Sequence, residues 1–423
     1  MNAANPASTN WSFAKKMAFR LFFCFFMFQF LLDPALYIFL FGFNISLYHW
    51  FEHLYAPVYS YLNSHVFHLT QTATKLTVNG FLFFITSIVT AVAATVLWSV
   101  VDQQRKSYTK ADFWLRHFLT YVLAIIIFSY GIDKLIPVQM PLPGTDDLYA
   151  RAGNLQPSYL FWILIGSHTF YQSFTGLVEI IAVLLLVFPR THVTGLMVLT
   201  ITLLNVLMLN ISFDIGVTYF VTVLLLAVLY LLSPYLDSIL YFLYHHKPGQ
   251  LYKQPTPGNS KLKQAITNLS AALFIVSALF NTSDSLKNYR KSIKRNATTK
   301  VFTVTNQHHG TDSVRMPRDS ERWKFWIEYR RKDKDYLSVL TMSDTVSYNL
   351  LLQTDTVHHL IRLTPDGQSP DSSSYTFVYK TGSRAGGKIL SDSLHEITIE
   401  IKPFTSEDWE LLKSRNKFFP FDF

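Results

Sequence analysis

A single glutamate lies in the middle of one of the most apolar stretches of this chain. Glu179 interrupts residues 170–190, FYQSFTGLVEIIAVLLLVFPR, which are otherwise mostly apolar. An ionisable group in such a stretch is costly in hydrocarbon, so it is a functional candidate by default. A carboxyl group that stays protonated there could donate a hydrogen bond to a quinone-like carbonyl, or it could relay a proton. The simpler alternative is that Glu179 only hydrogen-bonds neighbouring helices together.

Three further polar side chains share a helical spacing with this glutamate. His168, Gln172, Thr175 and Glu179 are separated by steps of 4, 3 and 4 residues, which place them on one face of a helix. Gly176 lies on the same face, where a small residue lets a neighbouring helix approach closely. The spacing therefore predicts a polar face that is directed into a helix bundle and away from lipid.

Helix geometry suggests which groups can meet Glu179. Residues 115 and 188 mark the expected inner ends of two apolar helices. If these two ends are level, a rise of 1.5 Å per residue puts Glu179 about 14 Å and Lys134 about 28 Å above them. We therefore expect no ion pair between Glu179 and Lys134. Asp214, at the outer end of a later apolar stretch, is the expected partner of Lys134.

Other polar side chains fall at the same two depths. Together with the residues above they predict a polar cavity that opens outward and has Glu179 at its floor. For the asparagines and threonines, simple hydrogen bonding between helices is the favoured interpretation. The additional cavity residues are Tyr121, Tyr130, Tyr171, Thr202, Asn205 and Asn210.

The composition indicates a membrane protein with a soluble domain. Of the 423 residues, 50% are hydrophobic and 15% are charged, whereas soluble domains carry about 25% charged residues. The long apolar runs end near residue 280. The net charge of +9 comes largely from basic residues that flank apolar runs, which argues against a nucleic-acid partner. The single cysteine, Cys24, excludes thiol–disulfide chemistry by this chain alone.

About seven apolar stretches are long enough to cross a bilayer, which takes about 20 residues. Asp33-Pro34 is expected to break or kink the first of them. The predicted spans are residues 17–42, 80–101, 115–136, 160–188, 193–212, 215–243 and 262–280.

Lysines and arginines alternate between the two ends of these spans. Twelve lie at the ends that share a side with the N-terminus, and three lie on the other side. This distribution predicts a cytoplasmic N-terminus and a C-terminal domain outside the cytoplasm. Five basic residues between 287 and 295 oppose that orientation. If the seventh segment does not cross, the C-terminal domain is cytoplasmic.

The stretch between the first two spans is rich in aromatic residues and histidine. His49 and His53 are four residues apart, and His65 and His68 follow. A metal site is one interpretation. Because aromatic belts are normal at membrane interfaces and no acidic motif accompanies the histidines, an interfacial helix without metal is the favoured one.

From about residue 300 the pattern changes to short strands. Seven segments rich in β-branched and aromatic residues are separated by turn residues, which predicts a small antiparallel sandwich or barrel. TSEDWELLK, residues 405–413, is expected to form a helix. The predicted regions are an N-terminal membrane region with an interfacial loop (1–112), a four-helix membrane core (113–245), a cytoplasmic loop, seventh span and charged linker (246–299) and the β domain (300–423).

Several segments together resemble a known family. LRHFLTYVLAIIIFSYGIDKL, PVQMPLP, FYQSFTGLVEIIAVLLLVFPRTHVTG and NVLMLNISFDI are similar to DoxX-like membrane proteins, in the longer bacterial form with a C-terminal β domain. The resemblance is good over about 113–240 and weaker over 17–100. The matching positions are Arg116, Tyr130, Gly131, Lys134, Gln139, Tyr171, Thr175, Gly176, Glu179, Arg190, Asn205, Asn210 and Asp214.

The resemblance implies a four-helix core in a bacterial inner membrane. The family is named after a subunit of a membrane complex that oxidises thiosulfate and reduces quinone, so it suggests quinone or another lipophilic molecule as the ligand. Such a chain could be a subunit of a quinone-linked oxidoreductase and is not expected to be an enzyme by itself. The alternative is a non-enzymatic scaffold whose β domain binds a partner outside the cytoplasm. A transporter is less favoured, because no inverted repeat is seen.

Overall fold

The structure is a computed structural model whose chain forms two compact units. The first unit comprises residues 1–139 and 173–285, and the second comprises 140–172 and 286–423. Each is considered by itself. The residues described are 10–41, 53, 56–68, 75–144, 155–246, 260–309, 322–331, 334–341, 347–365, 374–381, 388–392 and 397–404.

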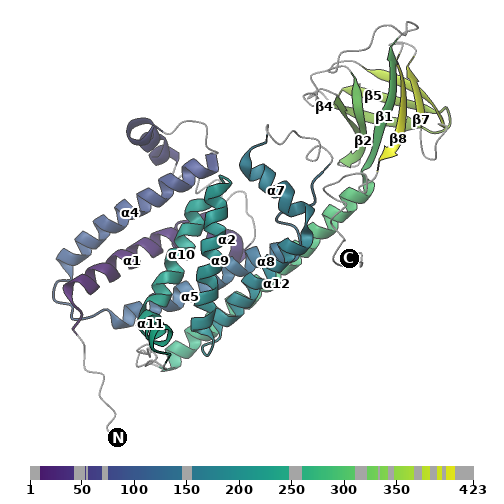
Figure 1. Ribbon diagram of the computed structural model, residues 1–423. Coiled ribbons are helices and arrows are strands. Elements are labelled where there is room, and N and C mark those ends of the chain that lie inside the picture. The colour runs from purple at the N-terminus through teal and green to yellow at the C-terminus, as the bar shows by residue number, and fades with distance from the viewer. Residues whose placement is uncertain are drawn as a thin grey trace. The chain divides into compact units, whose positions relative to one another are not determined.

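Helices make up the described part of the first unit (Figure 1). Six helical stretches there are long and apolar enough to cross a membrane: Val78–Val101, Thr109–Leu135, Thr169–Val187, His192–Ser212, Thr218–His245 and Lys261–Lys294. The helices are α1 (Phe13–Leu31), α2 (Pro34–Phe41), α4 (Lys75–Val101), α5 (Thr109–Leu135), α8 (Thr169–Val187), α9 (His192–Ser212), α10 (Thr218–Leu232), α11 (Leu236–His245) and α12 (Ser260–Thr298).

Two of the predicted spans are divided. The first is interrupted between α1 and α2, as expected, because Pro34 cannot continue a helix but is tolerated at the first position of the next one. The fourth is also interrupted, which was not predicted. It consists of α7 (Pro157–Ser167) and α8, and His168 between them has non-helical φ and ψ of −121° and 71°.

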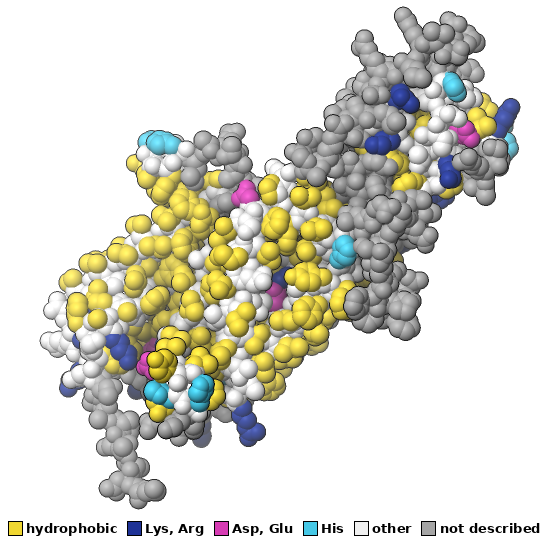
Figure 2. All heavy atoms as spheres, viewed as in Figure 1, with side chains coloured by type: hydrophobic (Ala, Val, Ile, Leu, Met, Phe, Trp, Pro, Cys, Tyr) yellow, Lys and Arg dark blue, Asp and Glu magenta, His cyan; other side chains and the backbone are white. Residues whose placement is uncertain are grey.

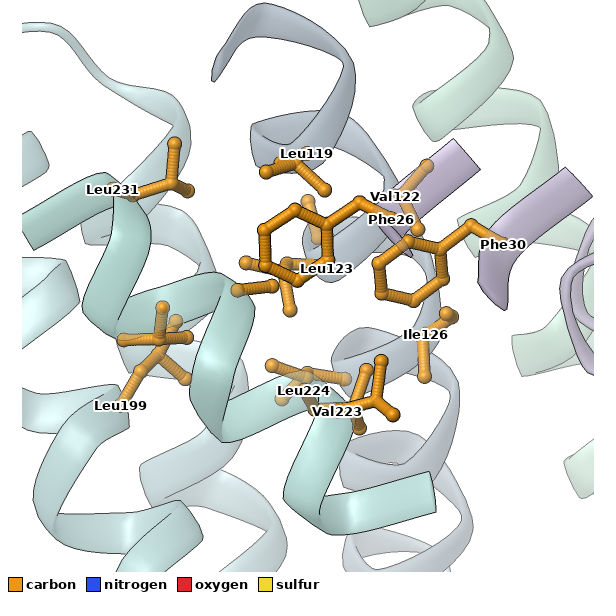
Figure 3. Packing of buried hydrophobic residues seen from close by; sticks show 14 of the residues in the cluster. Phe26, Phe30, Leu119, Val122, Leu123, Ile126, Leu199, Val223, Leu224 and Leu231 are labelled. Carbon is orange, nitrogen blue, oxygen red and sulfur yellow. The ribbon is translucent and has the colours of Figure 1, made fainter. Parts of the chain in front are cut away.

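The core of the first unit is built from large apolar side chains of α1, α5, α9 and α10 (Figure 3). The rings of Phe26 and Phe30 stack at 6.2 Å. They lie among aliphatic side chains from α5 and α10, as the close view shows. The buried residues labelled there are Phe26, Phe30, Leu119, Val122, Leu123, Ile126, Leu199, Val223, Leu224 and Leu231.

The outer surface of these helices is also apolar. Val89, Leu97 and Val101 of α4 are 62%, 68% and 85% exposed. Figure 2 shows apolar side chains covering most of the helical face in view, with Lys and Arg side chains along its lower edge. An apolar surface of this extent is expected where helices contact lipid. The helical unit is therefore that of a multi-pass membrane protein.

The last helix, α12, begins in the first unit and runs on beyond the predicted span. Residues 281–298, expected to form a charged linker, continue α12, which has 39 residues. At 1.5 Å per residue α12 is about 58 Å long, roughly twice the thickness of a hydrocarbon core. Ser277 Oγ and Asn281 Nδ2 donate hydrogen bonds to the Phe39 carbonyl of α2, so α12 is joined to the bundle by polar contacts.

The second unit contains a closed antiparallel barrel of eight strands. The strands pair in chain order, and β8 closes the barrel by pairing with β1. The predicted β domain is thus confirmed, in its barrel form. The strands are β1 (Lys300–His309), β2 (Trp323–Arg331), β3 (Lys334–Thr341), β4 (Ser347–Asp355), β5 (Leu360–Pro365), β6 (Tyr375–Thr381), β7 (Lys388–Asp392) and β8 (Ile397–Phe404).

The barrel interior is filled by side chains. Trp326, Leu337, Phe377, Leu390 and Ile399 each have 0% exposure. Eight strands enclose just enough room for such a core. Only β7 was not predicted, and the helix expected at 405–413 lies outside the described residues.

Candidate functional site

Two glycines bring α5 and α8 into close contact. A Cβ placed on Gly176 of α8 would lie 2.8 Å from Lys134 Cβ and would overlap the carbonyl oxygen of Gly131. A Cβ on Gly131 would lie 3.3 Å from Glu179 Cβ. Backbones this close are typical of small residues at crossings of membrane helices. The crossing places Lys134 and Glu179 on the two sides of one tight interface.

At this crossing, Lys134 and Glu179 form an ion pair. Lys134 Nζ donates to Glu179 Oε1. The residues are 8% and 4% exposed, so the pair is buried. The expectation that these residues would not pair is therefore wrong, as is the expected pairing of Lys134 with Asp214, which is exposed and follows α9 with a positive φ of 49°.

The error lies in the assumption that the helix ends are level. Gly131, which faces Glu179, is 16 residues from Leu115, whereas Glu179 is only 9 residues from Phe188. The two helices are thus displaced along their axes, and α5 extends further toward the end of the bundle where α5 begins and α8 ends. Lys134 is one turn beyond Gly131, so its side chain can reach back to the carboxylate.

The second carboxylate oxygen of Glu179 is left without a hydrogen bond. Oε2 is fully buried and has no donor in the part of the chain that the structure describes. A buried, unpaired acceptor costs about 1–3 kcal/mol, and such an exception calls for an explanation. A bound molecule with a hydroxyl group or an ordered water would satisfy this oxygen.

Gln172 and His168 act elsewhere than in the predicted cavity. The Gln172 side chain is buried, accepts a hydrogen bond from Met140 N at 3.1 Å and donates one to Met140 O at 2.9 Å. This pairing anchors the segment after α5. His168 caps α7 through a backbone bond to Ile165 and is not part of the α8 face. The polar face predicted from the 4–3–4 spacing is thus shortened at its N-terminal end.

The other predicted cavity residues are scattered. Tyr171 is 51% exposed, and Asn205 is exposed as well. Tyr130 packs its ring against Phe39 at 5.1 Å. Asn210 is buried, with its Nδ2 unpaired among the described residues. Thr175, Thr202 and Tyr121 are half-buried.

A polar cluster at the other end of α5 was not singled out from the sequence. Arg116 Nε donates to Asp112 Oδ2 at 2.9 Å, and Tyr230 Oη donates to Asp112 Oδ1 at 2.5 Å. Arg116 Nη1 also donates to the Tyr230 carbonyl at 2.8 Å. The i,i+4 spacing of Asp112 and Arg116 was a visible signal, but the contact with Tyr230 joins residues 114 positions apart.

A second buried arginine ties α1 to the α4–α5 turn. Arg20 is 3% exposed. It donates to Tyr108 Oη at 2.7 Å, to Ser99 Oγ at 2.7 Å and to the Asp102 carbonyl at 2.7 Å. Tyr108 Oη in turn donates to Asp102 Oδ2 at 2.9 Å. Arg20 thus joins α1 to α4 and to the α4–α5 turn by hydrogen bonds.

The histidine-rich loop shows no metal cluster in its described portion. Within the ranges described, no three His, Cys, Asp or Glu side chains converge. His65, which belongs to a π-helical turn at Asn63–Phe67, stacks on Tyr61 at 4.5 Å. His49 lies outside the described residues.

Fold and site together define a multi-pass helical membrane protein with a separate β-barrel domain. The uncharacterized protein YwoB of Bacillus subtilis (strain 168) is 34% identical over 110 residues, which are 26% of this chain and 70% of YwoB. The chain belongs to the same family as YwoB. No protein-family model and no solved structure matches it.

Proposed function

We propose that the helical unit is a DoxX-like membrane protein that binds a quinone or quinol beside the Lys134–Glu179 pair. The observation that carries the proposal is the buried, unpaired Oε2 of Glu179. The hydroxyl group of a quinol can donate a hydrogen bond to this oxygen. The lysine ammonium carries three N–H donors, and the ion pair uses one of them. The others can donate hydrogen bonds to a quinone carbonyl.

The proposed setting is a bacterial inner membrane, with the barrel outside the cytoplasm. The apolar helix surfaces support lipid contact, and the distribution of Lys and Arg supports this orientation. Quinones are confined to the hydrocarbon core, and Lys134 and Glu179 belong to α5 and α8, which are both long and apolar enough to span that core. The pair would orient the ring, and any redox partner would come from other subunits.

The Glu179→Gln substitution tests the role of the unpaired oxygen. Glutamine keeps an acceptor for Lys134 but can place an NH₂ donor where Oε2 was. We therefore expect the purified full-length variant to lose affinity for a short-chain quinol while it keeps affinity for the matching quinone, whose carbonyl accepts hydrogen bonds.

Binding of quinol and quinone is measured by titration in detergent, with wild type and Thr90→Val as references. Thr90 lies on α4 and bonds to its own helix at 2.7 Å, so its variant should behave like wild type. If Glu179→Gln binds quinol as tightly as wild type does, the pair is a helix-packing feature and the proposal is wrong.

A second candidate function is suggested by the surface of the barrel. Because its interior is filled, a partner would bind on the outside, where Val378 of β6 and Ile389 of β7 are 45% and 37% exposed. This would be the scaffold role. A Val378→Lys variant of the full chain should lose any partner that co-purifies with wild type and is identified by mass spectrometry.

A further inference from the structure

A cavity of about 270 Å³ lies at the end of the bundle where α5, α9 and α12 begin and α8 and α10 end. Lys263 is in the first turn of α12, and His192 is the first residue of α9. Arg116 and His117 of α5 also line it. Arg116 is 18 residues from Lys134 along α5, which corresponds to about 27 Å. This cavity is therefore separate from the ion pair.

The cavity wall is cationic. None of its lining residues is an aspartate or a glutamate. The charge of Arg116 is balanced by Asp112, but Lys263 has no carboxylate partner in the described ranges; its ammonium lies 5.4 Å from the centre of the Phe113 ring. A lysine held in this way is a suitable point charge for phosphate.

The two histidines supply further polar groups. His192 Nδ1 lies 2.8 Å from the Leu186 carbonyl oxygen, which can only accept, so Nδ1 carries the hydrogen. In the neutral ring Nε2 is therefore an acceptor, which suits a headgroup hydroxyl and not the phosphate itself. His117 Nε2 lies 3.2 Å from Ser270 Oγ of α12. A volume of about 270 Å³ is just below the usual range of small-molecule sites, so it suits a headgroup better than a whole lipid.

An apolar groove adjoins this cavity. It has a volume of about 730 Å³ and shares Pro189 with the cavity wall. Ile181, Leu184 and Phe188, which line it, are 46%, 44% and 61% exposed. Arg190, in the turn between α8 and α9, lies at the same groove. A cationic cavity next to an apolar groove matches a molecule with an anionic head and a hydrocarbon chain, and a free anion would use only the cavity.

We propose that this cavity binds the phosphate of an anionic phospholipid, whose acyl chain lies along the groove on α8. Basic pockets between membrane helices at the cytoplasmic interface are suited to such headgroups. Lys263 neutralises the phosphate and Arg190 lies beside the chain. The site does not depend on quinone binding, and it would make the stability of the helical unit sensitive to lipid composition.

The full-length protein, reconstituted in nanodiscs, provides the test. Its thermal unfolding is measured in pure phosphatidylcholine and in phosphatidylcholine with phosphatidylglycerol, and the difference in Tm is compared between variants, because a ligand that binds only the folded state raises Tm. Wild type should gain stability from phosphatidylglycerol. Lys263→Gln should lose most of this gain, and Lys261→Gln, an exposed neighbour on the same helix, should keep it.

Because the readout is a difference between two lipids, a uniform loss of stability in Lys263→Gln cancels. Thr267→Glu, which puts a carboxylate into the cavity wall, should also abolish the gain. Equal gains in wild type and both cavity variants would overturn the proposal. A gain of the same size from inorganic phosphate in pure phosphatidylcholine would show a site for soluble anions, which would likewise overturn it.

Discussion

At the residue scale, the buried pair Lys134–Glu179 should show strong coupling. Lys134→Met leaves a carboxylate in an apolar interface without its counter-charge. Removing one partner of a buried pair typically costs about 3–5 kcal/mol of unfolding free energy, whereas replacing both by apolar residues is often nearly neutral. We therefore expect Lys134→Met to be strongly destabilising and Lys134→Met/Glu179→Leu to recover most of the loss.

Denaturant unfolding of the full-length protein in mild detergent measures this double-mutant cycle. Thr90→Val on α4, which is remote from the pair in sequence, serves as the control for detergent effects. If the losses of unfolding free energy in the two single variants add up to the loss in the double variant, the two groups do not interact in the folded state.

The sequence identified Glu179 but not its partner. An ionisable residue in an apolar run can be recognised by composition alone, and Lys134 was recognised for the same reason. Their pairing depends on how far α8 is displaced along α5, which is set by the contact of Gly131 with Gly176. Helical periodicity fixes the face of a residue but carries no information on the relative height of two helices.

At the element scale, the α5–α8 crossing depends on the absence of a side chain at Gly176. A Cβ there would lie 2.5 Å from Leu135 N and 2.8 Å from Lys134 Cβ, so Gly176→Ala must push the helices apart. Overpacking of this kind costs about 1–3 kcal/mol. Gly80→Ala on α4 is the matched control, because its Cβ would meet Tyr219 at an ordinary 3.8 Å.

Thermal unfolding of the two alanine variants in the same detergent compares the sites. Gly176→Ala should lower Tm, while Gly80→Ala, which gains helix propensity, should leave it equal or higher. Equal Tm values for the two variants would show that the helices can separate without cost.

The β2–β3 hairpin carries an exposed ion pair that should be visible by titration. Arg330 Nε and Nη2 donate to the two carboxylate oxygens of Asp335 at 2.7 and 3.0 Å. These hydrogen bonds hold the pKa of Asp335 below its ordinary value. The stability that the Arg330–Asp335 ion pair contributes is therefore present above the unfolded pKa of about 3.9, and it is lost as the pH falls through the lower folded pKa of Asp335.

Arg330→Gln should raise the pKa of Asp335 toward its ordinary value, as followed by NMR titration of the carboxyl group. Because the side chains are 60% and 45% exposed, solvent screening limits the loss of stability to under about 1 kcal/mol. Arg362→Gln on β5 is the control. An unchanged titration of Asp335 in Arg330→Gln would show that the pair does not form in solution.

Element boundaries were predictable where they depend on local chemistry. Asp33-Pro34 interrupts the first span because of the proline ring itself. The break at His168 has a tertiary cause: the Met140–Pro141 backbone bonds to the Gln172 amide and lies against Gly166, where a Cβ would meet the Met140 carbonyl oxygen at 3.2 Å. β7 was missed because KILSD is short and has little alternation.

At the scale of the whole molecule, the barrel should fold without the helices. It closes on itself and has its own core, with Trp326 fully buried and its Nε1 donating to Glu328 at 2.9 Å. A fragment of residues 298–423 should be soluble, give a β-type circular dichroism spectrum and unfold cooperatively. Trp326→Ala should destabilise it by about 3–5 kcal/mol, and Val357→Ala, at a site that is 79% exposed, should have little effect.

A helical or unfolded spectrum of the 298–423 fragment would show that the strands need the preceding helix. Such a dependence could not be read from the sequence, where residues 281–299 looked like a charged linker, because a polar helix and a polar linker have similar compositions. The strand pattern itself was predictable, since most of the segments are rich in β-branched and aromatic residues and are bounded by turn residues.

The orientation of the whole chain determines on which side of the membrane the barrel lies. α12 is long enough to cross the bilayer and to extend beyond it, and α12 leads directly into β1. With Cys24 replaced, a cysteine at Ser374, which is exposed before β6, should react with a membrane-impermeant thiol reagent in intact spheroplasts. A cysteine at Lys261, exposed at the opposite end of α12, should react only after lysis.

This pattern is expected because Lys and Arg are concentrated at the end where α12 begins, and such residues are retained in the cytoplasm. The reverse pattern would place the barrel in the cytoplasm. It would also move the cationic cavity near Lys263 to the outer leaflet, so the same pair of cysteines locates the proposed phospholipid site.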